Sequence, residues 1–286
     1  MAVKTTCIDL DNSSEINMIE MSLAQLWIYP IKSLAGISLP QASITPRGFW
    51  LDRHWMLVDA LSGEFVTQRS LPQMALFQVM LENNCVTVLS RDGASVELNS
   101  DQADGRELSV KIWNESFIAE AVSQQLDQWF SQRLGKAVIL VRMPEQMQRQ
   151  VDPEYANIGE HTGFADGFPF LLLGTESVDE LNRRLPQGEV MTMQRFRPNL
   201  VIKTSKAHVE DSWKRIQIGE ISMRLVKPCS RCVITTINPQ TAEKTAEPLK
   251  TLAGYRKQGN KVMFGQNVLH DSLGTLYIGD PVQVLE

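Results

Sequence analysis

The sequence predicts a mixed, β-rich fold with a few peripheral helices. Short segments of alternating or β-branched residues, bounded by turn residues, outnumber the segments with helical spacing. The first hundred residues join such segments by short connections, which favours a barrel or sandwich over a parallel sheet. With 286 residues, of which 43% are hydrophobic, the chain is long enough for one large or two ordinary domains.

Composition limits the compartment and the partners. Residues 1–21 carry several acidic residues and no apolar core, so we expect a flexible tail and neither a signal peptide nor an anchor. No other stretch reaches the ~18 apolar residues needed to cross a bilayer. Four scattered cysteines are typical of a reducing compartment, so we expect a cytoplasmic protein that binds no membrane.

Nucleic acid is not an expected partner. The formal net charge of -5 argues against a surface committed to a polyanion. The tryptophans that fall in patterned segments are expected in the core and not on a stacking platform. These are Trp27, Trp55, Trp129 and Trp213.

The first half of the chain is predicted to be rich in strands. We expect strands over 23–30, 54–59, 65–68, 76–81, 85–89 and 137–142. Segments 54–68 and 76–89 are predicted hairpins, the second turning at Asn83 and Asn84. Apolar residues from Val122 to Leu134 recur at helical spacing before Gly135, which predicts a helix that ends there. The polar segment 143–166 has no pattern and is predicted to be an inter-domain connection or an active-site loop.

The second half continues this alternation. We expect strands over 168–174 and 197–202, a hairpin over 216–224, a short helix over 249–255, and closing strands near Val262 and over 276–285. Ser177 and Glu180 have the spacing of a capping box, which predicts a helix from Ser177 to about Leu185.

The cysteine segment 226–239 is the strongest candidate for chemistry. Pro228 is predicted to end the preceding strand, which places Cys229 and Cys232 on a turn before a buried strand over 233–237. Arg231 between the two cysteines favours the thiolate, which is the form that attacks electrophiles and binds metals. A zinc site lacks a second ligand pair, and a redox dithiol would precede a helix. The pattern therefore favours a lone reactive thiolate or a ligand for a soft metal.

Basic and hydroxyl residues near the predicted strand ends indicate an anion pocket. The basic members are Lys32, Arg53, Arg69, Arg195 and Arg197. Ser33, Thr175 and Ser177 add hydroxyl groups, and Asn199 offers an amide for a heteroaromatic edge. Each basic residue taken alone is also explained as a solvated surface charge, Ser177 as a helix cap, and Asn199 as a turn residue.

Five motifs in order along the chain resemble the MOSC superfamily. They are IYPIKS at 28–33, DRHW at 52–55, TQR at 67–69, FRPNLVI at 196–202 and CSRCVITT at 229–236. Together they are most similar to the branch with the mitochondrial amidoxime-reducing component and the bacterial YcbX-like proteins. The resemblance implies a MOSC-associated N-terminal β-barrel domain over 22–143, packed with a MOSC β-barrel domain over 144–286.

The resemblance also implies a molybdenum cofactor between the two domains. Cys232 matches the protein ligand of the metal, and Cys229 is its neighbour. The cofactor-binding positions of the family match Lys32, Ser33, Arg53, Arg69, Thr175, Ser177, Arg197 and Asn199. A pyridoxal phosphate association also exists at the level of the superfamily.

The implied activity is reduction of small N-hydroxylated substrates such as amidoximes. The chain has no cluster of cysteines like that of the C-terminal ferredoxin domain in YcbX-like proteins. Either a separate iron–sulfur or flavin protein would therefore donate the electrons, or the chain is a truncated form. Two alternatives stay open. One is a sulfur carrier with a persulfide on Cys232, and the other is a non-catalytic protein that binds the pterin cofactor.

Overall fold

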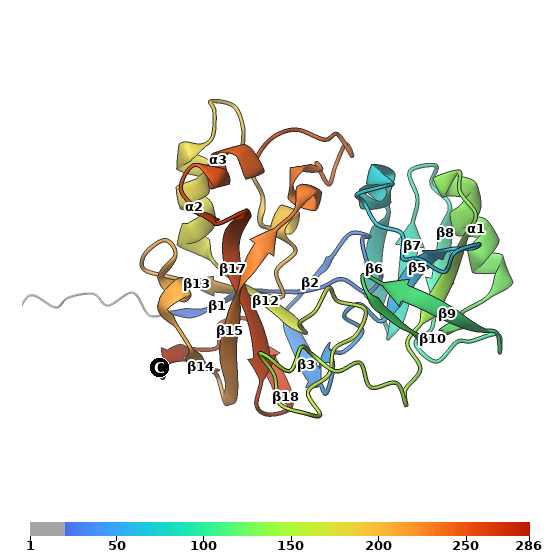
Figure 1. Cartoon of the computed structure of the whole chain (residues 1–286), viewed down its shortest axis with the longest axis horizontal. Helices are drawn as coiled ribbons and strands as arrows, with labels where there is room; N and C mark the ends of the chain where they lie inside the picture. The colour runs from blue at the N-terminus through green and yellow to red at the C-terminus, as the bar shows by residue number, and fades with distance from the viewer. Residues whose placement is uncertain (1–20) are drawn as a thin grey trace, which may run out of the picture.

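The computed structural model describes residues 21–286, and it is β-rich. Strands make up 39% and helices 16% of the structure, which confirms the predicted fold class. Figure 1 shows two parts side by side, one containing α2 and α3 and the other containing α1. Strand β1 lies in the first part, and β2 lies where the two parts meet.

The strands are β1 (Ser22–Ile28), β2 (Ile37–Leu39), β3 (Gln41–Thr45), β4 (Gly48–Phe49), β5 (Trp55–Asp59), β6 (Gln78–Glu82), β7 (Cys85–Leu89), β8 (Ser95–Leu98), β9 (Glu107–Ile112), β10 (Glu115–Ala121), β11 (Val138–Arg142), β12 (Phe170–Gly174), β13 (Leu200–Lys203), β14 (Arg215–Ile218), β15 (Ile221–Arg231), β16 (Lys257–Gln258), β17 (Lys261–His270), β18 (Gly274–Tyr277) and β19 (Val282–Val284). The helices are α1 (Gln124–Leu134), α2 (Thr175–Arg184) and α3 (Leu249–Ala253). Short 3-10 helices are η1 (Pro72–Leu76), η2 (Met193–Phe196), η3 (Val209–Ser212) and η4 (Val233–Thr236).

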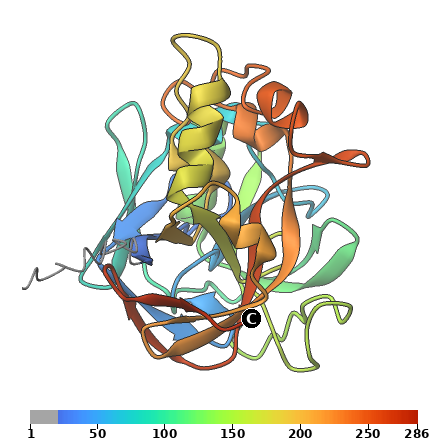
Figure 2. The same cartoon turned by 90° about the vertical axis from the view of Figure 1, so that its left-hand side faces the viewer.

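The largest sheet joins both ends of the chain. Its strands run in the order β19-β14-β15-β17-β12-β13-β1-β2, and β16 pairs with β17. Only the β12–β13 pair in it is parallel among the described residues. Helix α2 packs on β12 and β13 (Figure 2). Because β1 and β2 come from the predicted N-terminal domain, the two domains share this sheet.

The other part is built from two smaller sheets and α1. Their strand orders are β5-β11-β10-β9 and β6-β7-β8, while β3 and β4 pair with β18 in a third small sheet. One hydrophobic core includes Leu26 of β1, Trp55 of β5, Phe130 of α1 and Val268 of β17. This core crosses from one part to the other, so it fixes the walls of any site between them.

Two local predictions are confirmed with their expected geometry. Asn83 and Asn84 both adopt positive φ, 49° and 64°, as a two-residue turn between β6 and β7 requires. Helix α1 begins after Ser123, whose side chain accepts a hydrogen bond from Leu126 N, and ends at Gly135 in the left-handed conformation. The 54–68 hairpin is shorter than predicted, because only Phe65 bridges to β5.

The predicted helix cap at Ser177 is wrong. Helix α2 begins two residues earlier, after Gly174, and no side chain of its own caps it. Glu210 of η3 takes over that role: its Oε1 accepts from Gly174 N at 3.1 Å and from Ser177 Oγ at 2.6 Å. The cap therefore comes from a residue 33 positions away, which local spacing could not reveal.

The predicted break at Pro228 is also wrong, because β15 continues to Arg231. Strand β14 pairs with β15 only as far as Arg224, so the later half of β15 has β17 as its single partner. The pairing with β17 shifts register between Leu225 and Lys227 and again after Pro228. A proline is tolerated there because an edge or bulged position does not need its missing N–H.

The segment after Cys232 forms η4 and not the predicted buried strand. The hydroxyl of Thr235 donates to Cys232 O at 3.0 Å, and that of Thr236 donates to Val233 O at 2.8 Å. Such bonds to carbonyls three residues back compete with a strand ladder and favour a turn of helix.

Between β11 and β12 the chain has no regular element, as predicted for 143–166. Arg149 anchors this loop to the other part: it pairs with Glu115 of β10 and donates to Gly163 O and Ala165 O. Within 21–286 no helix is both long and apolar enough to span a bilayer.

Candidate functional site

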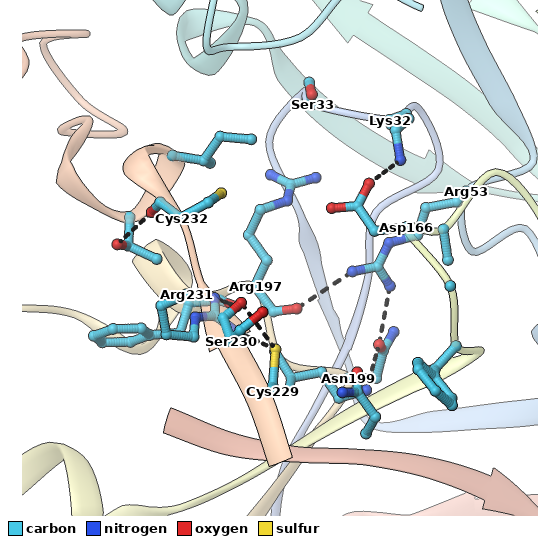
Figure 3. A pocket seen from close by; sticks show the side chains of 18 of the residues that line it. Lys32, Ser33, Arg53, Asp166, Arg197, Asn199, Cys229, Ser230, Arg231 and Cys232 are labelled. Atoms are coloured by element: carbon cyan, nitrogen blue, oxygen red, sulfur yellow. Dashed lines mark hydrogen bonds and ion pairs between the residues drawn. The ribbon is translucent and has the colours of Figure 1, made fainter. Parts of the chain in front are cut away.

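A cleft lies where the two parts meet, and it brings together most of the residues predicted from the sequence. Its lining includes Lys32, Ser33, Arg53, Arg69, Arg197, Asn199 and Cys232, together with Asp166, Arg195, Cys229 and Arg231. The cleft has a volume of about 150 Å³, and other cavities adjoin it. In Figure 3 the two cysteines lie on one side, opposite Lys32, Asp166 and Arg53.

Cys232 is a half-buried thiol with a guanidinium beside it. Its sulfur accepts a hydrogen bond from Arg69 Nη2 at 3.2 Å. Arg69 comes from the other part of the molecule and stacks over Trp113, with its guanidinium carbon 4.6 Å from the ring centre. A cationic donor at this distance stabilises negative charge on sulfur, which is the form that binds soft metals.

Arg231 does not contact the sulfur of Cys232. It donates to the sulfur of Cys229 at 3.0 Å and to Phe196 O at 2.6 Å. Residues two apart in β15 point to the same face, which explains this pairing. The sequence predicted that Arg231 favours the thiolate form of the neighbouring cysteines. In the structure Arg69 donates to the sulfur of Cys232, and Arg231 donates to the sulfur of Cys229.

Lys32 and Asp166 form the opposite wall. Lys32 Nζ lies 2.6 Å from Asp166 Oδ1 and 2.7 Å from Phe164 O. Burial lowers the pKa of Lys32, while Asp166 opposes that shift. Burial alone would raise the pKa of Asp166, yet Lys32 and Arg69 hold it well below its usual range. Asp166 is thus an anion in a cleft of cations, and 58% of its side chain is open to solvent.

Arg53 is held by a buried polar network. It pairs with Asp52 and donates to Asn199 Oδ1 at 2.9 Å. The Asn199 amide also donates to Asp52 at 3.0 Å and to Trp27 O at 3.1 Å, and accepts from Leu171 N at 3.2 Å. All four hydrogen-bonding positions of this amide are therefore used within the chain. In this structure Asn199 positions Arg53 and has no free group for a ligand.

Three of the predicted site residues adopt the left-handed backbone conformation. The φ angles are 71° at Ser33, 48° at Arg53 and 55° at Arg197. This conformation is uncommon outside glycine and costs energy unless the surroundings enforce it, and such strain concentrates at functional sites. Tyr29 lies between two of them, with Arg53 4.4 Å and Arg197 4.1 Å from its ring centre.

The structure does not bring Thr175 and Ser177 to the cleft. Ser177 is fully buried, donates to Glu210 and accepts from His208 N at 2.8 Å. Thr175 accepts from Thr204 N at 3.3 Å. Both hydroxyls therefore bond within the α2–η3 region, and neither lines the cleft.

Sequence reasoning missed Asp166 as a site residue. It is the last residue of the loop predicted over 143–166, so the loop was predicted but Asp166 was not singled out as a functional residue. Its proximity to Lys32 depends on a contact 134 positions apart in sequence, for which no local signal exists.

The charges of the cleft fit an anionic cofactor that carries its own metal ligands. Six cationic side chains line it: Lys32, Arg53, Arg69, Arg195, Arg197 and Arg231. Asp166 is the one carboxylate among the described lining residues. Within residues 21–286 no three His, Cys, Asp or Glu side chains gather to hold a metal. A metal at Cys232 would need further ligands from outside this part of the chain.

Comparison with known proteins identifies the family. The description "MOSC N-terminal beta barrel domain" matches residues 20–137, and "MOSC domain" matches residues 159–283. The mouse mitochondrial amidoxime-reducing component 1 is 31% identical over 92% of this chain and 82% of that protein. The chain belongs to the MOSC family. The human mitochondrial amidoxime-reducing component 1 is 30% identical to this MOSC protein, over 92% of this chain and 83% of its own length.

A second group of relatives is longer. The rice molybdenum cofactor sulfurase is 29% identical over 90% of this chain, which spans 33% of that protein. The tomato protein of the same name is similar, with 30% identity over 85% of this chain and 32% of its own length. The MOSC protein thus spans about a third of the sulfurases and most of the amidoxime-reducing components.

Proposed function

We propose that this MOSC protein binds a molybdenum cofactor with Cys232 as the protein ligand and reduces small N-hydroxylated compounds. One observation carries the proposal: an accessible sulfur, held by Arg69, lies in a cleft lined by six cations. The names of the amidoxime-reducing relatives support the substrate class, and both groups of relatives support the cofactor.

In this proposal the residues of the cleft have different roles in binding the cofactor. Cys232 provides the thiolate, and Arg69 orients it. Lys32, Arg53 and Arg197 supply charge for the phosphate of the cofactor, with the fork of an arginine suited to two phosphate oxygens. The hydroxyl of Ser33 is available as a further donor, while Asn199 keeps Arg53 in place. Thr175 and Ser177 have no part in this proposal because they lie elsewhere.

The reduction of an N-hydroxyl group needs two electrons and two protons, and it releases an amine or amidine and water. The cofactor, when bound, supplies the two-electron redox chemistry at its metal. The open face of the cleft beside Asp166, Gly167 and Phe168 adjoins a wider cavity of about 740 Å³, which gives a substrate a route to Cys232. An electron donor must then return the two electrons.

Turnover by the cofactor-loaded protein tests the reaction. Benzamidoxime and a viologen reductant replace the unknown substrate and electron donor. We expect benzamidine to form, and Cys232→Ser to abolish its formation while Cys85→Ser, on the far β7, leaves it unchanged. A fully loaded protein that reduces no N-hydroxylated compound would instead support the non-catalytic cofactor-binding function.

A persulfide carrier is the second candidate, and the pair of thiols favours it. Cys229 and Cys232 line one cleft, and each accepts a hydrogen bond from its own arginine. Two thiols with cationic neighbours suit transfer of a sulfur atom from one to the other. After incubation with a cysteine desulfurase and cysteine, mass spectrometry of metal-free protein would show a stable added sulfur on Cys232 if this function holds.

A further inference from the structure

A second cavity adjoins the cleft on the other side of its arginines. Its volume is about 380 Å³, within the range of roughly 300 to 1,000 Å³ found for small-ligand sites. It shares Arg195, Arg197 and Ile234 with the cleft. Its remaining walls come from both parts of the molecule, including Trp27 of β1 and Leu76 of η1.

The charge lining this second cavity is entirely positive. Arg91, Arg195 and Arg197 line it, and none of its described lining residues is Asp or Glu. Arg91 is exposed at the surface and donates to Gln240 O at 3.3 Å. Arginines that line one cavity without a carboxylate repel one another, because the surrounding protein screens charge less than water does.

Arg195 is the most informative of the three. Only 8% of it is exposed, and the one hydrogen bond of its guanidinium within residues 21–286, to Thr235 O, has a length of 3.5 Å. No carboxylate lies within 4 Å of its guanidinium in the described part of the chain. Burial lowers its pKa, and Glu189, which lies beyond 4 Å, opposes that shift. Buried charges in proteins are normally paired, so a guanidinium held in this way lacks an anionic partner.

Arg197 also lacks an anionic partner within 4 Å among the described residues. It donates to Leu34 O at 2.6 Å and stacks on Tyr29, but it has no carboxylate partner in the described residues. Burial lowers its pKa to about 10, so it keeps its charge at neutral pH. Its backbone has the left-handed conformation, which costs energy. The rest of the fold compensates for this cost and holds the side chain between the two cavities.

The other walls of the second cavity combine apolar residues with four glutamines, Gln68, Gln78, Gln194 and Gln240. Trp27 is half-buried, contrary to the predicted core position, and its indole N–H is already bound to Gln25. Ala35, Ala75, Leu76 and Ile237 are among its apolar lining residues. An indole face next to guanidinium groups suits a planar aromatic group that carries a negative charge.

We propose that the second cavity is a binding site for a small aromatic anion, in which Arg195 and Arg197 hold a phosphate or carboxylate group and Trp27 contacts the ring. The site lies in a different cavity from the proposed cofactor position, but Arg195 and Arg197 line both cavities, so its test uses the cofactor-free chain. Its ligand would sit beside Ile234 of η4, directly after Cys232, where it can influence the conformation of the cysteine segment.

Calorimetric titration of the cofactor-free full chain tests the site. The probes are phenyl phosphate, benzoate, inorganic phosphate and phenol, which separate the anionic group from the ring. We expect phenyl phosphate or benzoate to bind at one site per chain, and at least about tenfold more tightly than phenol or inorganic phosphate. Arg195→Gln is expected to weaken that binding about tenfold, and Trp27→Ala to weaken it several-fold, while Trp27→Phe stays close to wild type.

The matched variant is Arg69→Gln, because Arg69 lines the cleft and not the second cavity. It is expected to keep the wild-type affinity for the aromatic probe. Loss of affinity in Arg69→Gln with none in Arg195→Gln would place the anion in the cleft and overturn the proposal. So would equal binding of inorganic phosphate and phenyl phosphate, or no saturable binding of either aromatic anion. Metal content is measured separately, so failure here leaves the role of Cys232 intact.

Discussion

Replacing Asn199 with alanine should destabilise the whole protein, because this one amide links the two parts behind the cleft. The residue is 1% exposed and makes four side-chain hydrogen bonds. Two of them join charged groups, Arg53 and Asp52, and the others satisfy backbone groups of Leu171 and Trp27. Removing the amide leaves these buried partners unsatisfied.

The size of the effect follows from those four bonds. A hydrogen bond to a charged group contributes about 1.5 to 3 kcal/mol, and each buried group left unpaired costs about 1 to 3 kcal/mol. Since Asp52 and Arg53 still have each other, we expect a total loss of about 3 to 4 kcal/mol in the free energy of unfolding. With a urea dependence of about 3 kcal/mol per molar, the unfolding midpoint falls by roughly 1 M.

Urea unfolding followed by circular dichroism measures this loss. Asn157→Ala is the matched control, because Asn157 is exposed and its side chain forms no hydrogen bond among the described residues, so its effect should stay within about 0.5 kcal/mol. A loss below about 1 kcal/mol in Asn199→Ala would refute the view that the amide holds Arg53 and the two parts in register.

Three further predictions concern the arginines and carboxylates around the site. Arg69→Gln should slow alkylation of Cys232 by iodoacetamide about 3- to 10-fold and leave alkylation of Cys229 unchanged. Arg231→Gln should slow alkylation of Cys229 and leave that of Cys232 unchanged. Peptide mass spectrometry measures both rates, and the same effect of one variant on both thiols would contradict the pairing. Asp166→Asn removes the carboxylate from a cationic cleft, so inorganic phosphate should bind there several-fold more tightly in calorimetry, and unchanged affinity would count against an anion site. Burial raises the pKa of Glu210, so wild type should lose stability as the pH rises above the unfolded value of 4.5, because the unfolded chain then releases this proton first. Thermal melts of Glu210→Gln should show a flatter pH profile from 4.5 to 7, and an equally steep profile would exclude Glu210 as the cause.

The sequence predicted correctly those turns and helix ends that depend on residues close together in the chain. The Asn83–Asn84 turn and the stop at Gly135 both rest on residues that tolerate positive φ, and both appear as predicted. The cleft was also largely predicted, since Lys32, Arg53, Arg69, Arg197 and Cys232 all line it. Residue type and order along the chain, together with the resemblance to a known family, were sufficient for that.

The remaining features depend on distant contacts. Pro228 stays in β15 because β14 has already ended, and Ser177 turns away from the cleft because Glu210 lies beside it. The pairing of Arg69 with Cys232 joins residues 163 positions apart. Neither the spacing of residues nor their secondary-structure propensity predicts contacts between residues so far apart in sequence. The boundary at residue 143, the cytoplasmic location and the pyridoxal phosphate association stay predictions.

The molybdenum content of purified protein tests the central claim most directly. Wild type, Cys232→Ser and Cys229→Ser would be made in a host that synthesises the cofactor, and the metal counted per chain by mass spectrometry. We predict about one molybdenum per chain in wild type and in Cys229→Ser, and little or none in Cys232→Ser. A Cys232→Ser protein that keeps its molybdenum would contradict the assignment of Cys232 as the ligand.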